Sequence, residues 1–410
     1  MRILVVSQYY YPENFRINDI CEELVKRGNE VVVLTGLPNY PEGVIPAEYK
    51  FGKKRRETIN GVSVIRCFEI ARRKGSLWRI LNYISFMISA NQMAKRINVD
   101  SFDIIYGYAM SPITQMKAAL TLKKRSGKSI LLYCCDIWPE ALKGVIPEDN
   151  IAFKWAKKVS KEVYTGSDII QVTSKPFIDY IHQEHGVPVA KLEYLPQHAE
   201  DGYLTMDLSS EENGVVDFLF AGNVGTVQDL DCIVNACKLL KMKIPNGWMI
   251  HIVGDGSYLD TTKKLVHENG LDECFSFYGR HPVTEMPKYY KIADACLLTL
   301  KGDTAVGLTI PSKLQGYMAA AKPVIGAING AAKEVIEKAE CGLCVAASDY
   351  NGLAKIMKEF ILNFDMYKHC GNKGRDYFKS HFTKKIFMDA LEKELIDMCG
   401  EKTSQIKVGT

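Results

Sequence analysis

The residues with the clearest chemical meaning stand at a predicted helix start, Pro311-Ser312-Lys313. A proline is tolerated in the first turn of a helix, because the N–H group that it lacks would have no partner there. The free N–H groups and the dipole at a helix start favour an anion, and Ser312 and Lys313 add a hydroxyl and a positive charge. The run therefore predicts a phosphate or diphosphate site. The alternative is an ordinary helix start with a solvated lysine.

A second set of polar residues follows expected strands in the first half of the chain. The carboxyl ends of parallel strands lie at one edge of a sheet, where ligands of such folds bind. Asp136 follows an apolar strand, so its carboxylate is a candidate for orienting a hydroxyl or a sugar; a helix cap is the alternative. The other candidates for this edge are Glu13, Arg16, Asn39 and Glu140.

Several familiar site motifs are missing from the sequence. A nicotinamide or flavin enzyme places a G-x-G-x-x-G turn directly after its first strand, but residues 8–14 contain no glycine. Cys341 and Cys344 have no partner pair and lie in an apolar run, so we expect them to be structural. There is no Walker A loop and no G-x-S-x-G elbow. No acidic cluster is expected to hold a metal, so no metal is expected.

The elements that position these residues alternate from end to end. Apolar runs rich in β-branched residues alternate with amphipathic stretches, which is typical of βαβ units and mostly parallel sheets. Runs that are apolar throughout predict strands buried on both faces, so helices should cover both sides of each sheet. Strands are predicted at 2–7, 30–35, 62–67, 103–107, 129–134, 168–173 and 192–196, then at 216–222, 249–254, 274–279, 295–300, 322–326 and 341–346.

The pattern predicts an α/β protein with two doubly wound, Rossmann-like domains. The chain has 410 residues, of which 47% are hydrophobic, so it can form two or three substantial cores. We expect an N-terminal domain at 1–200, a second domain at 201–380, and a C-terminal helix and tail at 381–410 that packs back on the first domain. The two domains should face each other across a ligand-binding cleft.

The charge is unevenly distributed. Residues 1–200 carry 28 Lys/Arg against 21 Asp/Glu, and residues 50–96 alone carry 12 against 2. Within that basic segment, residues 77–88 have the apolar and aromatic pattern of an interfacial helix, which predicts contact with an anionic membrane surface. The alternative is a core helix with a solvated basic flank. No uncharged run reaches the roughly 18 residues of a spanning helix.

Twelve scattered cysteines without a preceding signal peptide predict reduced thiols and a cytoplasmic protein. Together with the basic segment, they predict a location at the inner face of the cytoplasmic membrane.

Seven motifs spread over nearly the whole chain point to a known family. They are residues 2–43, DIWPE at 136–140, LFAGNVGTVQDL at 219–230, VGDG at 253–256, FYGR at 277–280, the helix at 311–313, and GAAKEVIEKAECGL at 330–343. In these motifs the chain resembles the retaining GT-B glycosyltransferases of glycosyltransferase family 4. More narrowly, it is similar to the WbuB-like branch, which builds O-antigen and capsule repeat units in bacteria; PENFRIND and PNYPEG, within residues 2–43, are specific to that branch.

The resemblance implies a UDP-sugar donor held mainly by the second domain, with no cofactor and no metal. It places Lys313 and Glu334 at the chemistry. From its position after a strand, Asp136 is the third catalytic candidate, and Glu13, Arg16, Asn39 and Glu140 are the acceptor-binding candidates. The donor-binding set comprises Gly222, Asn223, Gly225, Gln228, Pro311, Ser312 and Lys313 at the diphosphate, Gly254, Gly256 and Arg280 at the nucleoside, and Gly330 and Glu334 beside them.

One feature of the family is missing. Many members carry two glutamates eight positions apart, and the matching positions here are Leu308 and Gly316. The ribose contacts are then expected from Gln315, Asp303 or Glu334.

The expected reaction transfers an N-acetylated or deoxy hexose to a lipid-linked saccharide on polyprenyl diphosphate, with retention at the anomeric carbon. No nucleic acid partner is expected. Two alternatives stay open: a nucleotide-sugar 2-epimerase of the same fold, and a non-catalytic subunit of a polysaccharide assembly complex.

Overall fold

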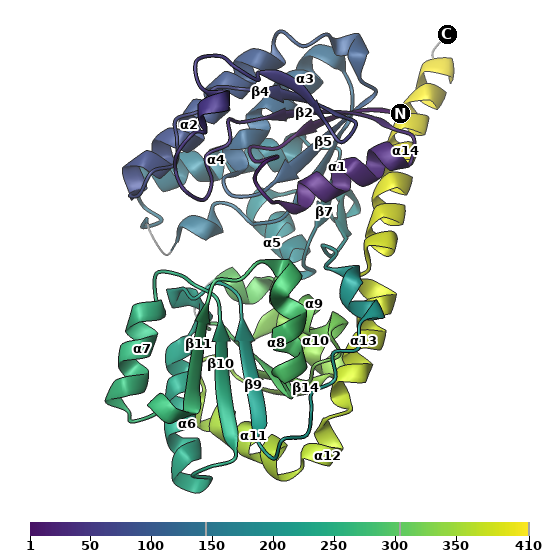
Figure 1. Cartoon of the computed structure of the whole chain (residues 1–410). Helices are drawn as coiled ribbons and strands as arrows, with labels where there is room; N and C mark the ends of the chain where they lie inside the picture. The colour runs from purple at the N-terminus through teal and green to yellow at the C-terminus, as the bar shows by residue number, and fades with distance from the viewer. Residues whose placement is uncertain (144–145, 303–304, 409–410) are drawn as a thin grey trace. The chain divides into compact units, whose positions relative to one another are not determined.

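The computed structural model describes residues 1–143, 146–302 and 305–408. They form two units, each with one sheet and its own helices (Figure 1). The first unit comprises Met1–Leu195 together with the chain from Met388 onward, and the second comprises Pro196–Phe387. The chain therefore passes into the second unit five residues before the predicted boundary at residue 200.

The first unit is built on an eight-stranded sheet in the order β3-β4-β2-β1-β5-β6-β7-β8. All neighbours are parallel except β3 and β4, which form an antiparallel hairpin. The strands are β1 (Arg2–Val6), β2 (Glu30–Thr35), β3 (Arg56–Ile59), β4 (Val62–Arg66), β5 (Ile104–Ala109), β6 (Ile130–Cys134), β7 (Ile169–Val172) and β8 (Leu192–Tyr194).

Its helices bury one face against the sheet. In α1, Ile17, Ile20, Cys21 and Leu24 are fully buried, which is the i, i+3, i+4, i+7 spacing of one helical stripe. The helices of this unit are α1 (Arg16–Lys26), α2 (Ser76–Ala94), α3 (Lys117–Ser126), α4 (Ile151–Gly166) and α5 (Pro176–His185).

The second unit has a six-stranded, all-parallel sheet in the order β11-β10-β9-β12-β13-β14. The strand order reverses between β9 and β12, just as it reverses between β1 and β5 in the first unit. Ligands of doubly wound folds bind at the carboxyl ends of such switch-point strands. The strands are β9 (Val216–Ala221), β10 (Trp248–Val253), β11 (Phe275–Gly279), β12 (Ala295–Thr299), β13 (Val324–Ala327) and β14 (Gly342–Val345).

Helices cover both faces of this sheet, as predicted. Leu219 and Leu298 pack with Leu314 of α9 in one buried cluster, whereas Phe218 and Phe220 lie in another with α6 and α11. The helices are α6 (Leu230–Lys243), α7 (Leu259–Glu268), α8 (Met286–Ile292), α9 (Ser312–Ala319), α10 (Gly330–Lys338), α11 (Tyr350–Leu362), α12 (Phe364–Tyr367) and α13 (Cys370–His381).

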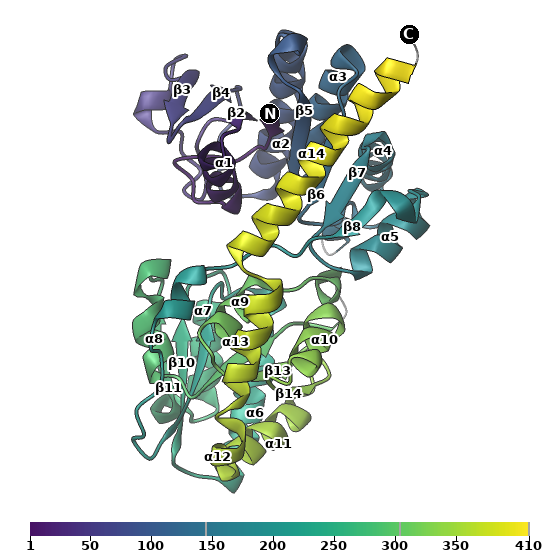
Figure 2. The ribbon, with the colours of Figure 1, turned by 90° about the vertical axis from the view of Figure 1, so that its right-hand side faces the viewer.

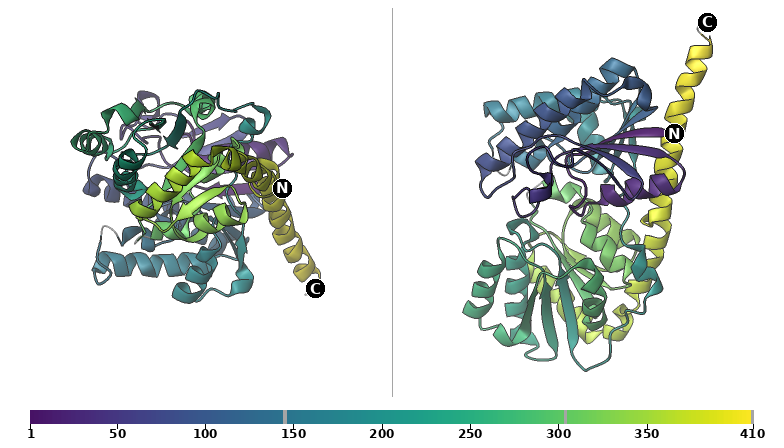
Figure 3. Two further views of the ribbon diagram at one scale, coloured as in Figure 1. Left: turned by 90° about the horizontal axis from the view of Figure 1, so that it is seen from below. Right: turned by 45° about the horizontal axis from the view of Figure 1, so that its top comes forward.

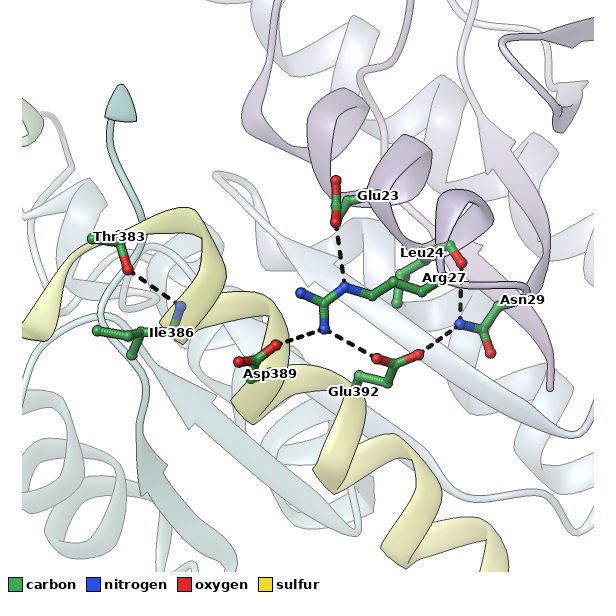
Figure 4. A network of polar contacts seen from close by, with 8 residues as sticks. All are labelled: Glu23, Leu24, Arg27, Asn29, Thr383, Ile386, Asp389 and Glu392. Atoms are coloured by element: carbon green, nitrogen blue, oxygen red, sulfur yellow. Dashed lines mark hydrogen bonds and ion pairs between the residues drawn. The ribbon is translucent and has the colours of Figure 1, made fainter. Parts of the chain in front are cut away.

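The last helix, α14 (Lys384–Val408), belongs to both units. It begins in the second unit and from Met388 onward counts with the first, as one unbroken ribbon drawn in yellow in Figures 2 and 3. The Arg27 guanidinium at the end of α1 contacts Asp389 at 2.9 Å and Glu392 at 3.0 Å (Figure 4). Asn29 also donates to Glu392 at 3.0 Å, so this network fastens α14 to α1 within the first unit.

Among the helices of the described residues, none is both long and apolar enough to cross a membrane.

Candidate active site

Each unit holds its own group of candidate site residues, and the group in the second unit is centred on Lys313. Helix α9 begins at Ser312 with Pro311 as its N-cap, one position later than predicted. The Lys313 ammonium nitrogen lies 3.8 Å from the centre of the Phe220 ring. This nitrogen is buried and has no hydrogen-bond partner among the described residues. The solvated lysine of the alternative interpretation is therefore wrong.

Burial lowers the pKa of Lys313 to about 7. An ammonium without a hydrogen-bond partner loses its hydration on burial, and its contact with the Phe220 ring replaces only part of that loss. An anion placed beside it would therefore be bound strongly. The lysine stem lies against Gly222, where an added Cβ would come within 3.2 Å of the Lys313 Cε atom. Gly222 also has a φ of 130°, which a side chain would disfavour. Glycine at this position therefore lets the lysine reach Phe220.

The loop after β9 is held by its own side chains. The Gln228 Oε1 atom accepts hydrogen bonds from the Gly225 N–H group at 3.0 Å and from the Asn223 amide at 3.2 Å. The Thr299 hydroxyl at the end of β12 donates to the Gln228 carbonyl at 2.6 Å. Asn223 and Gln228 thus shape the loop at the switch point, while Asn223 itself remains exposed.

The glycines after β10 pack against that same loop. A Cβ on Gly254 would lie 1.8 Å from the Gly222 carbonyl oxygen, and one on Gly256 would lie 2.3 Å from the Val224 carbonyl oxygen. The Val224 N–H group donates to the Asp255 carbonyl at 3.0 Å. Backbone contact between the two loops is therefore sufficient reason for both glycines, and their predicted approach to a nucleotide stays a prediction.

The remaining donor candidates also follow strands of this sheet. Arg280 follows β11 and is exposed. Gly330 starts α10 so close to the segment before α9 that a Cβ would meet the Gly307 carbonyl oxygen at 1.9 Å. Glu334 is exposed on α10 and pairs with Lys338 at 3.2 Å.

Two of the three proposed substitutes for the missing glutamates can be placed. Gln315 is buried, and its side-chain amide donates to the Gln197 carbonyl at 2.5 Å. Its amide is therefore committed to the segment that enters the second unit. Glu334 keeps an exposed carboxylate, and Asp303 lies outside the described residues.

In the first unit, Glu13 joins the loops after β1 and β2. Its carboxylate accepts hydrogen bonds from the N–H groups of Asn39 at 2.6 Å and Tyr40 at 2.5 Å. Burial raises the pKa of Glu13 to about 7, although these two donors oppose the shift. Glu13 thus acts as a brace between two loops at the carboxyl edge of the sheet.

Asn39 is also buried, and its partners include a glutamate that sequence reasoning missed. Its amide donates to Glu69, and its Oδ1 atom accepts from the Arg72 N–H group at 2.7 Å. Glu69 is fully buried and also accepts from the Gln8 amide at 3.2 Å. Burial and the nearby Glu13 carboxylate raise the pKa of Glu69 well above its ordinary value. The available signal was its position: it follows β4 directly and is one of only two acids in the basic segment.

Asp136 links the ends of β5 and β6. Its Oδ2 atom accepts from the Ser111 N–H group and the Ser111 hydroxyl, both at 3.1 Å, and the Trp138 indole donates to that hydroxyl at 2.8 Å. Burial raises the pKa of Asp136. Asp136 is partly buried as a residue, and its two hydrogen bonds to Ser111 fix its carboxylate.

The last two acceptor candidates lie at the same edge. Glu140 follows β6, accepts from the Tyr180 hydroxyl at 2.9 Å and pairs with Lys143 at 2.7 Å. Arg16 is the first residue of α1 and is half-buried. The donor candidates thus lie in the segments that follow strands β9 to β13 of the second unit. The acceptor candidates lie in the segments that follow β1, β2 and β6 of the first unit.

Known proteins agree with this division of the chain. Residues 15–197 match the family model "Glycosyltransferase Family 4", and residues 209–377 match "Glycosyl transferases group 1". The chain therefore carries the paired domains of the GT-B glycosyltransferases, as the predicted fold class requires.

Two curated relatives and one solved structure illustrate the likeness. The probable glycosyltransferase WbjE of Pseudomonas aeruginosa is 25% identical over 284 residues, which is 65% of this chain and 68% of the relative. The putative colanic acid biosynthesis glycosyl transferase WcaI of Escherichia coli is 26% identical over 341 residues, 78% of this chain and 81% of the relative. The crystal structure of Anabaena HepE in complex with UDP shares the fold, with a TM-score of 0.71 at 13% identity over 97% of this chain and all of that one.

Proposed function

We propose that the protein transfers a sugar, an N-acetylated or deoxy hexose, from a UDP-sugar to a hydroxyl of a lipid-linked saccharide in bacterial surface polysaccharide synthesis. The observation that carries the proposal is the buried, unpartnered ammonium of Lys313 at the N-terminus of α9. A diphosphate supplies the negative charge that this arrangement lacks. The colanic acid role of WcaI and the UDP bound to HepE support the choice of pathway and donor.

The reaction proceeds with retention in the family that the chain resembles. The bond between the anomeric carbon and the diphosphate oxygen breaks, and the acceptor oxygen bonds to the same face of that carbon. The departing diphosphate oxygen takes the proton of the acceptor hydroxyl. The protein then needs chiefly to position both substrates and to stabilise the charge on the leaving group, which falls to Lys313 and the α9 N-terminus. Asp136 orients the acceptor, and Glu334 contacts the donor.

A membrane surface is the natural source of such an acceptor. Helix α2 exposes Leu77, Ile80, Ile84 and Ile88 along one side, which we call the α2 apolar stripe. Residues 70–99, which contain this helix, carry six Lys/Arg and no Asp/Glu. An apolar stripe within a purely basic segment fits the surface of an anionic leaflet, so we propose that the protein binds there peripherally.

A donor screen with and without acceptor tests the proposal. Purified protein is incubated with UDP-glucose, UDP-N-acetylhexosamines and GDP-mannose, either alone or with a short-chain prenyl diphosphate sugar. Transfer products are detected by mass spectrometry, and their configuration, and that of the nucleotide sugar, is determined by NMR. Transfer that requires both substrates, with an α-linked product from an α-linked donor, supports the proposal. Epimerised nucleotide sugar without acceptor would instead show a 2-epimerase. Intact donor under all conditions would show a binding subunit.

A further inference from the structure

Arg72 has an unusual environment in the first unit. Its Nη1 atom donates to the Tyr9 hydroxyl at 3.3 Å, and its guanidinium carbon lies 5.5 Å from the Tyr40 ring centre and 5.6 Å from the Tyr83 ring centre. The side chain is half-buried. In the part of the chain that the structure describes, no carboxylate forms an ion pair with it. A desolvated guanidinium therefore keeps most of its N–H donors and its full charge for another group.

The neighbouring acids are committed elsewhere. Glu69 accepts from Asn39 and Gln8, and Glu13 accepts from two backbone N–H groups. Burial raises the pKa of both carboxyls, so they neutralise little of the arginine's charge. Asp136, which is near Tyr83, is bound to Ser111.

The backbone of Arg72 is fixed on two sides. Its N–H group donates to Asn39, which Glu69 holds in turn. On the other side lies Gly43, where a Cβ would come within 2.6 Å of the Arg72 carbonyl oxygen, and the Gly43 N–H group donates to the Asn39 carbonyl at 2.7 Å. The buried acids of this unit thus hold the base of the arginine. Such preorganisation lowers the entropy lost when a ligand binds.

We propose that Arg72 binds the diphosphate of the lipid-linked acceptor, with Glu69, Asn39 and Gly43 as positioning residues. A guanidinium matches the paired oxygens of phosphates better than a lysine does, because its planar fork donates two parallel hydrogen bonds. The donor diphosphate already has its candidate partner in Lys313 of the other unit. The segment from Arg72 also leads directly into α2, whose apolar stripe suits a prenyl chain attached to the same diphosphate. This inference rests on the proposed function.

Geranyl diphosphate, a soluble prenyl diphosphate, is the probe. Its affinity is measured by calorimetry on the full chain, with saturating UDP present to occupy the donor site. Arg72→Gln removes the charge, and Arg73→Gln is the matched control because its side chain is exposed next to it. We expect Arg72→Gln to weaken binding by about tenfold or more and Arg73→Gln to change it by less than about twofold. Geranyl glucoside, which lacks phosphate, should not distinguish Arg72→Gln from wild type.

The remaining measurements separate the competing explanations. Equal affinity of wild type and Arg72→Gln for geranyl diphosphate would overturn the inference. The inference would also be overturned if Arg72→Gln no longer floated with phosphatidylglycerol vesicles but still bound geranyl diphosphate, because Arg72 would then bind lipid headgroups. If Arg72→Gln does not fold, Arg72→Lys, which keeps the charge without the fork, is expected to lose affinity and is measured instead. Wild-type protein that transfers no sugar refutes the proposed function, whereas transfer with an unchanged acceptor KM in the Arg72 variant refutes this inference alone.

Discussion

The unpartnered ammonium of Lys313 shows how one residue can be prepared for a ligand by its surroundings. Phe220 comes from β9, Gly222 from the loop after it and Lys313 from α9, and each contributes to burying the nitrogen. In the folded protein this burial is unfavourable, since a charge has left water without gaining a partner. Binding of an anion offsets that cost, so the site favours negatively charged ligands.

Replacing Lys313 with methionine should therefore separate activity from stability. We expect turnover to fall by about 100-fold or more, the scale of losing one preorganised donor to a transition-state charge. The melting temperature should stay the same or rise, because an apolar chain of similar length fills the same space. Lys355→Met, at an exposed position of α11, is the control for both measurements. Near-normal turnover of Lys313→Met would remove the lysine from the donor site.

Donor binding should also take up a proton. The pKa of Lys313 is about 7 in the free protein, and a neighbouring diphosphate would raise it, so affinity should decline as the pH rises above 7. UDP-glucose is a suitable probe because its phosphates do not titrate in this range. Calorimetry at pH 7.5 in buffers of different ionisation enthalpy measures the protons taken up. A number near zero in wild type, or the same number in Lys313→Met, would contradict the assignment.

At the scale of elements, most strands follow from the sequence because buried parallel strands read as apolar runs. The predicted strands at 30–35 and 62–67 match β2 and β4 within one residue. The exception is β3, whose residues Arg56–Ile59 are largely polar because it is a solvent-facing edge strand. Its turn carried a signal: Asn60 and Gly61 have φ values of 50° and 83°, and an Asn-Gly pair between strands favours a two-residue hairpin.

The site residues were harder to assign than the strands. Loops behind strands could be located from the sequence, so the predicted residues do lie at the carboxyl edges. Whether a side chain points outward or inward depends on neighbours from other strands. Asn39 and Glu13 are therefore buried and hold loops together by hydrogen bonds. Glu69 and Arg72 could be identified only from the structure, because they contact Asn39 across the loops that follow β2 and β4.

The buried carboxyl of Glu13, which joins the loops after β1 and β2, should make the free energy of unfolding depend on pH. A carboxyl whose pKa rises from an ordinary 4.5 to about 7 on folding binds more protons in the folded state. Its contribution is present below pH 4.5 and is lost as the pH rises through 7, by roughly 3 kcal/mol at most.

Glu13→Gln keeps an oxygen for both N–H groups and removes the ionisation. The melting temperature of wild type should fall by several degrees more than that of the variant between pH 5 and pH 8. Glu48→Gln, at an exposed position between β2 and β3, is the control and should follow wild type. Parallel curves for all three proteins would mean that Glu13 does not titrate on unfolding.

At the scale of the whole molecule, the two units repeat one plan. The order β4-β2-β1-β5-β6-β7 in the first unit corresponds to β11-β10-β9-β12-β13-β14 in the second. In each unit, candidate site residues follow the carboxyl ends of the strands around the point where the strand order reverses. Charge distinguishes the units, because the basic segment and the α2 apolar stripe both belong to the first. This difference is consistent with a division of labour between a membrane-bound acceptor and a water-soluble donor.

Vesicle flotation tests that division. Wild-type protein should float with phosphatidylglycerol vesicles at low salt and be released at high salt, since each basic residue near an anionic surface contributes about 1 kcal/mol. Ile80→Ser with Ile84→Ser should abolish flotation and leave UDP binding unchanged. Met242→Ser with Leu362→Ser removes exposed apolar residues from the second unit and should have no effect. Equal flotation of both double variants would exclude the α2 apolar stripe as the docking surface.

The division of α14 between the units has a consequence for synthesis on the ribosome. Met388, Leu391 and Leu395 are buried, and Asp389 and Glu392 pair with Arg27, so the first unit needs residues from the far end of the chain. A nascent chain therefore completes its second unit before the first has all of its parts. Until residues 388–395 have been synthesised, α1 lacks its partner helix, and a chain released before that point exposes the uncovered surface to chaperones and proteases.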